Sequence, residues 1–298
     1  MNLTDDIAFF LEENGFKYSL QTRVGLDVLC VRTFAGNSEK IILPLEITGE
    51  SIEDAEVKAE EAMACVEKVR TDDGDYPLII TRDRWERQKN MMEKRLLSHL
   101  EVFTPIYARN CEIRRIDKET AAGFLEMNHS YGDAACRYRY GMFLKRHTGH
   151  LARTDIGDCF ASGTLVAVAT FSNARKWKKG EKEIRSYEWT RFASLPELRI
   201  SGGMGRFLKH FIKEVKPDDI MTYSDLEWSE GEVYRQLGFT LENRKGPVTF
   251  RIGIDTWTRT ALSKIVSEDS VLAKDNCSTR FFRNFGSNKF RLKLTDYE

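Results

Sequence analysis

Three side chains in the second half of the chain are suited to acid–base chemistry: Glu188, Asp225 and Tyr234. Glu188 lies between Tyr187 and Trp189, and burial among aromatic rings would raise the pKa of its carboxyl group toward that of a useful base. Asp225 could orient or deprotonate an incoming amine, and the phenol of Tyr234 could protonate a leaving group. We expect Asp225 and Tyr234 to meet in one cleft.

Each of the three side chains also has a structural interpretation. Glu188 could pair with Arg191 or Arg185 on the face of a strand. Asp225 could cap a helix, and Tyr234 could be a core aromatic residue. The sequence alone leaves these alternatives open.

A glycine-rich turn, Gly202-Gly203-Met204-Gly205-Arg206, precedes an amphipathic helix that the apolar spacing predicts over residues 207–215. Such a turn presents free backbone N–H groups at the positive end of a helix dipole, which suits an anionic ligand such as a pyrophosphate. Arg206 would lie near the phosphates. The alternative is a turn that only packs the helix onto a strand.

The elements that must position these residues alternate between strand and helix. A strand predicted over residues 184–194 leads toward the glycine turn, and a strand over 220–224 precedes Asp225. Residues 111–254 as a whole predict the order β-α-β-β-β-α-β-α-β-β. We therefore expect an α/β (α+β) fold with a mixed central sheet.

This order of elements, the turn at 202–206 and the ending Tyr-x-x-Leu-Gly-Phe at 234–239 resemble the coenzyme-A-binding half of the GNAT superfamily of N-acyltransferases. The resemblance implies acyl transfer to an amine from acetyl-CoA or another acyl-CoA, with Tyr234 protonating the leaving thiolate. The chain departs from the usual pattern Gln/Arg-x-x-Gly-x-Gly/Ala, because Met204 stands at its last position. The cofactor-binding residues that the resemblance implies are Phe192, Ala193, Arg199, Gly202, Gly203, Gly205 and Arg206.

Residues 1–103 predict a separate, smaller α/β domain with the order αβββαβα. That order resembles PD-(D/E)XK nucleases, in which Asp27 and Glu46 would be the two acids that hold Mg²⁺. Thr48 stands where that family has Lys, or Asn in one branch. We therefore expect a degenerate nuclease-like domain, with an active Mg²⁺-dependent endonuclease and an unrelated α/β domain as alternatives.

The resemblance extends to a group of phage-type and mobile-element proteins, in which a GNAT-like domain follows a domain similar to very-short-patch-repair endonucleases. The C-terminal half of this chain is also similar, more distantly, to phage Mom-type DNA-modification enzymes. The segments that carry these resemblances are 107–113, 124–129, 202–205, 223–229 and 284–290.

Three residues are candidates for contact with the acceptor. Asn128 and His129 close a predicted helix and could face the substrate groove, although a capping role is the alternative. Trp177 lies in a basic segment, predicted as a loop over 175–182, and could stack on a base while its neighbours bind phosphates. DNA or RNA is therefore an open alternative as acceptor or partner, and a solvated loop is the other.

Composition bears on three questions: whether the chain binds nucleic acid, whether it spans a membrane, and which compartment it occupies. Lys plus Arg and Asp plus Glu both number 46, so no global positive field indicates nucleic-acid binding. No apolar run approaches the roughly 20 residues that span a bilayer. Six dispersed cysteines favour a reducing cytoplasm.

We expect a nuclease-like domain (1–103), an acyltransferase domain (104–254) and a basic aromatic extension (255–298). A silent nucleic-acid-binding protein is the third functional alternative.

Overall fold

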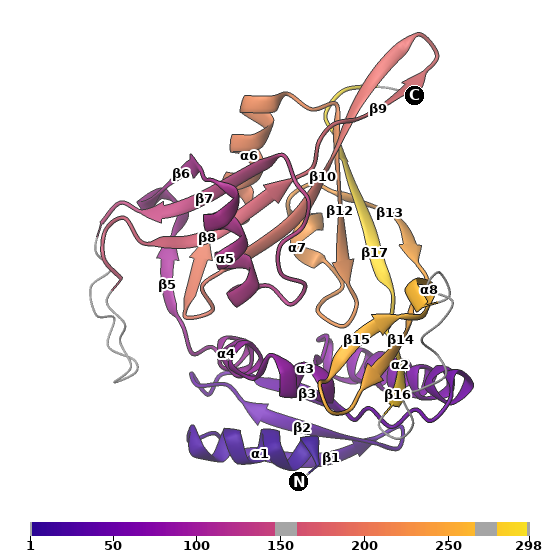
Figure 1. The fold of residues 1–298 in the computed structure, drawn as a ribbon. Helices are drawn as coiled ribbons and strands as arrows, with labels where there is room; N and C mark the ends of the chain where they lie inside the picture. Colours follow the sequence, from indigo (N-terminus) through magenta and orange to yellow (C-terminus); the bar gives the residue numbers. More distant parts are fainter. Residues whose placement is uncertain (1, 147–159, 266–278, 297–298) are drawn as a thin grey trace. The chain divides into compact units, whose positions relative to one another are not determined.

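The chain passes several times between two compact units. A computed structural model describes residues 2–146, 160–265 and 279–296 (Figure 1). Unit 1 comprises Met1–Glu101, Ser224–Glu230 and Arg244–Asn288. Unit 2 comprises Val102–Tyr223, Gly231–Asn243 and Lys289–Glu298. This interleaved division differs from the three consecutive domains expected from the sequence.

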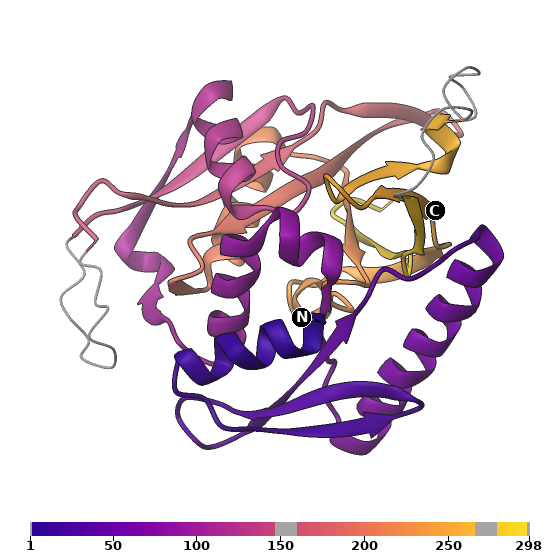
Figure 2. The ribbon, with the colours of Figure 1, turned by 60° about the horizontal axis from the view of Figure 1, so that its bottom comes forward.

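Unit 1 is built on a four-stranded sheet with the order β1-β2-β3-β4, in which only the β3–β4 pair is parallel. Side chains alternate between the two faces of a strand. Those of β2 and β3 that face α2 are buried with Cys65, Val66 and Val69 of that helix. Helix α1 packs on the opposite face (Figure 2). The bounds are α1 Leu3–Glu13, β1 Tyr18–Arg23, β2 Leu26–Arg32, β3 Glu39–Leu45, α2 Ile52–Asp73 and β4 Leu78–Thr81.

The helix expected from about 84 to 100 is two helices that meet at Gln88, whose ψ of 35° leaves the helical region. The C-terminal part of unit 1 adds a three-stranded antiparallel sheet with the order β15-β14-β16. The bounds are α3 Arg82–Arg87, α4 Lys89–His99, β14 Thr249–Gly253, β15 Thr258–Ala261, α8 Leu262–Ile265 and β16 Thr279–Arg283.

Unit 2 is built on the large mixed sheet, which confirms the α/β class. The order of its strands is β13-β17-β12-β10-β8-β7-β6, with β9 paired only to β10. Strands β6 to β10 run antiparallel, whereas β10 and β12 are parallel. The bounds are β6 Cys111–Arg115, β7 Tyr138–Leu144, β8 Leu165–Phe171, β9 Arg175–Lys179, β10 Lys182–Ser194, β12 Asp219–Asp225, β13 Thr240–Lys245 and β17 Ser287–Lys293.

Helices cover both faces of this sheet. On one face Phe211 of α6 stacks on Phe171 with ring centroids 3.9 Å apart. On the other face Leu125 of α5 is buried with Val168 and Ala193. The element order expected for 111–254 is observed, with β9 and β11 added. The bounds are β5 Thr104–Tyr107, η1 Ala108–Asn110, α5 Lys118–Asn128, β11 Leu198–Ser201, α6 Gly203–Val215 and α7 Glu232–Gln236.

Two expectations need correction. The basic segment 175–182 is not a loop, because β9 and β10 pair there as a hairpin. Residues 255–298 are not an extension, because β17 lies between β13 and β12 within the sheet, with Phe290 fully buried. The alternating burial along β17 is typical of a strand paired within a sheet. Its partners, β13 and β12, lie far away in the sequence, so the local sequence does not distinguish β17 from a tail.

Candidate functional site

The parallel strands β10 and β12 share a short ladder. It covers Ser186–Glu188 and Asp219–Met221, yet β10 continues to Ser194 and β12 to Asp225. Just past the ladder, β10 bulges between Trp189 and Arg191 against β8. Bulges of this kind re-aim side chains and interrupt pairing near active sites. A ligand with an extended backbone can pair with strand groups at such an opening.

The glycine turn forms the N-terminus of α6, as the sequence predicts. Gly202 is the N-cap residue with φ of 77°, a conformation that costs glycine little, and it makes no side-chain cap hydrogen bond. Gly203 is buried, and a Cβ on it would lie 3.1 Å from Ile200 Cγ2. Backbone N–H groups in the first turn of an uncapped helix are suited to an anion.

Tyr234 lies beside the point where the two strands separate. Its ring is 6.2 Å from that of Trp189 and 5.6 Å from that of Phe290. Burial raises the pKa of its phenol, while the neighbouring Thr222 hydroxyl acts in the opposite direction. The Thr222 hydroxyl also donates to the Trp189 carbonyl oxygen at 3.1 Å. The phenol therefore stays protonated at neutral pH.

Glu188 occupies the last pair of the short ladder, opposite Met221. Its backbone N–H donates to the Ser172 hydroxyl at 2.9 Å, which fixes this part of β10. The side chain is half-buried and makes no hydrogen bond or ion pair within residues 2–146, 160–265 and 279–296. Burial lowers the pKa of the Arg191 guanidinium, and the nearby Glu188 carboxylate acts in the opposite direction, so Glu188 does interact with a cation.

Of the remaining residues predicted to bind a cofactor, two pack against helices, one is exposed, and one bonds to a backbone carbonyl oxygen. Phe192 packs against Phe207 of α6 with ring centroids 6.1 Å apart, and Ala193 is buried on the α5 face. Arg199 is exposed and its guanidinium lies over the Phe103 ring. Arg206 donates to the Ala108 carbonyl oxygen, so its guanidinium ties α6 to η1.

The predicted acceptor residues lie at two distant points of the sequence in unit 2. The Asn128 amide donates to the Phe124 carbonyl oxygen at 2.9 Å, and His129 Nδ1 accepts from the Tyr131 backbone N–H at 3.1 Å. Both contacts are those of a helix end. Trp177 lies in the β9–β10 hairpin and keeps 36% of its surface exposed.

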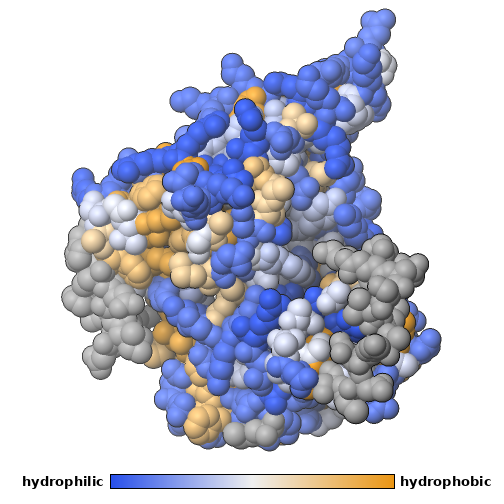
Figure 3. Space-filling view, in the orientation of Figure 1, coloured by the Kyte–Doolittle hydropathy of each residue, from blue (hydrophilic) through white to orange (hydrophobic). Residues whose placement is uncertain are grey.

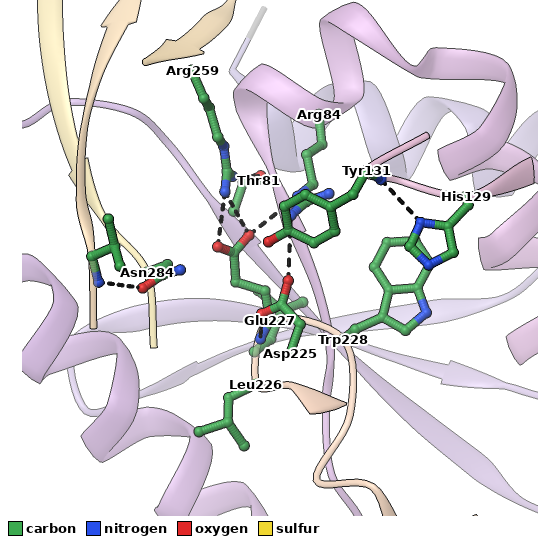
Figure 4. A network of polar contacts seen from close by, with 12 residues as sticks. Thr81, Arg84, His129, Tyr131, Asp225, Leu226, Glu227, Trp228, Arg259 and Asn284 are labelled. Carbon is green, nitrogen blue, oxygen red and sulfur yellow. Dashed lines mark hydrogen bonds and ion pairs between the residues drawn. The ribbon is translucent and has the colours of Figure 1, made fainter. Parts of the chain in front are cut away.

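Asp225 belongs to unit 1 and lies at the edge of a buried charge network (Figure 4). Its carboxylate accepts from the Glu227 backbone N–H at 2.9 Å and lies 3.6 Å from Arg84 Nη2. Glu227 contacts Arg84 at 3.1 Å and Arg259 at 2.8 Å. Arg259 also binds Asp83.

The network holds the Glu227 carboxylate ionised. Burial alone would raise the pKa of Glu227, but Arg259 and Arg84 outweigh burial and hold that pKa at about 2. Arg95 adds to the positive charge nearby and lies 3.5 Å from the centroid of the Trp228 ring. This arrangement fixes the segment Ser224–Glu230 within unit 1.

A separate pocket of about 300 Å³ lies within unit 1 and is lined by both predicted metal-binding acids, Asp27 and Glu46. Glu46 accepts from the Leu3 backbone N–H at 2.5 Å. Lys58 of α2 also lines the pocket, and its ammonium group donates to the Thr48 carbonyl oxygen at 3.1 Å. The sequence analysis missed Lys58, because only the packing of α2 brings it to Thr48.

No group of three or more His, Cys, Asp or Glu side chains among the described residues is placed to hold a metal ion. None of their helices combines the length and apolar character that crossing a bilayer requires.

Solved structures align with this chain at low identity. The NatC complex bound to Gag peptide and CoA matches with 11% identity and a TM-score of 0.34, over 62% of this chain and 99% of that chain. Arabidopsis thaliana NAA60 in complex with acetyl-CoA matches with 9% identity and a TM-score of 0.35, over 62% and 98%. A GNAT-family acetyltransferase from Bacillus anthracis matches with 13% identity and a TM-score of 0.30, over 62% and 95%. No family model and no curated protein matches the chain.

Proposed function

We propose that this chain is an N-acyltransferase that uses an acyl-CoA donor and carries its active site in unit 2. The observation that supports this most is that the β10–β12 ladder ends at Glu188 and Met221 while both strands continue, with Tyr234 beside Trp189 and the glycine turn beside α7. Helix α7 links these features. Tyr234 contacts Trp189 at the bulge, and a Cβ on Gly205 would lie 3.2 Å from Leu237 Cδ2.

The residues around this opening fit coenzyme A. The turn from Gly202 to Gly205 would bind the pyrophosphate through backbone N–H groups, and the positive end of α6 complements its charge. The extended pantetheine arm suits the opening between two strands. When bound, acyl-CoA supplies an activated thioester and a thiolate leaving group.

Two side chains of unit 2 would move protons. Glu188, whose half-buried carboxylate lies near Arg191, would accept a proton from the incoming amine. Tyr234 holds a proton on its phenol oxygen, because burial raises its pKa, and would provide it to the leaving group. Asp225 is paired with Arg84 in unit 1, which disfavours a role as base.

The test is release of free thiol from acetyl-CoA in the presence of a panel of primary amines. We expect amine-dependent release that Glu188→Gln lowers by about 10²-fold or more, as loss of a general base does. A matched Glu183→Gln variant alters an exposed glutamate near the start of the same strand and should keep the full rate. Equal rates for wild type and Glu188→Gln would contradict the proposed base.

The pocket in unit 1 supports a second candidate, a Mg²⁺-dependent endonuclease. Continuing the β2–β3 register places Asp27 opposite Pro44, so Asp27 and Glu46 fall on the same face of the sheet. Mg²⁺ is commonly bound by one or two carboxylates plus water and phosphate, which this pair could provide. Bound there, the ion would activate water and neutralise phosphate charge. Lys58, which pairs with Asp54 at 2.7 Å and donates to the Thr48 carbonyl oxygen, would supply the positive charge that Thr48 lacks.

This second function is tested by incubating plasmid and single-stranded DNA with the protein and Mg²⁺. Cleavage that both Asp27→Asn and Lys58→Ala abolish would support the endonuclease. Lys68→Ala is the matched control, since Lys68 is an exposed lysine of the same helix. Cleavage that persists in Asp27→Asn would assign the activity to a contaminant.

A further inference from the structure

The β9–β10 hairpin is a strongly basic feature of unit 2. Residues 175–185 contain six basic and two acidic side chains, although the whole chain has a formal net charge of zero. Every side chain of β9 is exposed, and β9 pairs with β10 alone. The hairpin extends away from the large sheet, and its surface is hydrophilic (Figures 1 and 3).

The register divides these charges between two faces of the hairpin. Residues directly opposite each other in an antiparallel pair share a face. Lys179 lies opposite Lys182, Trp177 opposite buried Ile184, and Arg175 opposite buried Ser186, which defines face A. The exposed part of face A is therefore formed mainly by the β9 side chains. On the other side Lys178 lies opposite Glu183 and Lys176 opposite Arg185, which defines face B.

The two faces differ in how their charges are compensated. On face B, Lys176 pairs with Glu183 at 2.9 Å, Arg185 lies 3.5 Å from Asp218, and Lys178 makes no ion pair within the described residues. On face A, Arg175 and Lys179 make no ion pair within the described parts of the chain. Lys182 donates to the backbone carbonyl oxygen of Asp296, which leaves its charge without a carboxylate partner there. Like charges directly opposite each other, such as Lys179 and Lys182, repel and destabilise a hairpin. An anionic ligand on face A would reduce this repulsion.

Face A also combines charge with an aromatic ring. Arg175, Trp177 and Lys179 follow each other at every second residue, which separates them by about 6.8 Å along the strand. Single-stranded nucleic acid is bound by positive groups that track its backbone and by aromatic rings on which bases stack. A membrane surface fits less well, because the tip residues Lys179–Lys182 include no apolar side chain to insert.

We propose that face A of the β9–β10 hairpin is a docking surface for single-stranded nucleic acid, with Arg175 and Lys179 on phosphates and Trp177 stacked on a base. This inference does not depend on acyl-CoA binding. Substitutions on face A should abolish nucleic-acid binding without affecting acyl-CoA binding, and substitutions in the glycine turn should do the reverse.

The test compares charge reversal on the two faces. Binding of a fluorescein-labelled oligothymidylate to the full chain is followed by anisotropy as the salt concentration varies. Arg175→Glu/Lys179→Glu and Lys176→Glu/Lys178→Glu change the net charge equally on the same strand. We expect the face A variant to lose about tenfold or more in affinity and its log–log salt slope to fall by about 1.4, at about 0.7 per phosphate contact.

A further pair of variants isolates the aromatic contact. Trp177→Ala should weaken binding by about tenfold, whereas Trp177→Phe should retain most of it, because stacking needs a ring. Thermal melting of each variant verifies that the fold is intact. Equal losses on both faces, no binding of the oligonucleotide by wild type, tighter binding of duplex, or binding of anionic vesicles instead would each overturn the proposal.

Discussion

At the scale of single residues, burial determines which titratable groups can take part in chemistry. Desolvation raises the pKa of the Tyr234 phenol, so at neutral pH this group can donate a proton but cannot accept one. Glu227 has the opposite environment, since Arg259 and Arg84 keep it ionised. The first group is suited to general-acid catalysis and the second to holding a loop in place.

Tyr234→Phe tests the proposed general acid. The substitution keeps the ring contacts with Trp189 and Phe290 but removes the proton. We expect kcat for acyl transfer to fall by about 10²-fold, while KM for acyl-CoA and the melting temperature stay close to the wild-type values. An unchanged kcat would leave Tyr234 as a core aromatic residue only.

Glu227→Gln tests the structural role of the charge network. Removing one partner of a buried ion pair should lower the free energy of unfolding by about 3–5 kcal/mol, measured by urea denaturation at pH 7. Glu230→Gln is the control in the same segment, because the pair of Glu230 with Arg70 is partly exposed and should contribute about 1 kcal/mol or less.

The same network predicts an acid dependence. The pKa of Glu227 is about 2 in the folded chain, below its ordinary value of 4.5, so its stabilisation is complete above pH 4.5 and is lost as the pH falls toward 2. Wild type should therefore lose more stability than Glu227→Gln between these pH values. Parallel losses in the two proteins would contradict the assignment.

At the scale of elements, local patterns and long-range pairing were not equally predictable. The order of helices and strands in 111–254 follows from apolar periodicity and the glycine turn. The apolar pattern of segment 175–182 predicts a loop, because every residue of β9 is exposed and the buried partners of β9, Ile184 and Ser186, lie on β10. The role of β17 depends on strands far away in the sequence, which periodicity cannot identify.

A chain that ends at Gly286 tests the role of β17. It would lose Phe290 from the core and the pair between Arg291 and buried Asp219 at 2.6 Å, and it would expose the facing edges of β12 and β13. We expect aggregation or a broad, non-cooperative thermal transition by circular dichroism. A chain that ends at Asp296 keeps β17 and should melt as wild type does. A cooperative transition of the shorter chain at the wild-type temperature would refute this role.

At the scale of the whole molecule, the chain builds each unit from separated segments, so a site cannot be located from one stretch of sequence. The pocket that contains Asp27 and Glu46 is an example, because Phe281 and Phe285, from far along the chain, also line it. The fold also places Arg82 Nε 3.8 Å from Glu46 and Lys58 at the Thr48 carbonyl oxygen. Asp225 and Tyr234, nearby in sequence, belong to different units. The glycine turn, by contrast, could be predicted because all its geometry is local.

In the proposed function, the turn at the start of α6 binds the pyrophosphate of an acyl-CoA. The most direct measurement is calorimetric titration of the chain with acetyl-CoA and with CoA. Gly203→Glu would place a carboxylate and a crowded Cβ in this turn, whereas Gly123→Glu alters an exposed glycine of α5 with open space around it. We predict micromolar binding by wild type and Gly123→Glu and none by Gly203→Glu. Absence of binding by wild type at millimolar ligand, or unchanged binding by Gly203→Glu, would contradict the proposed site.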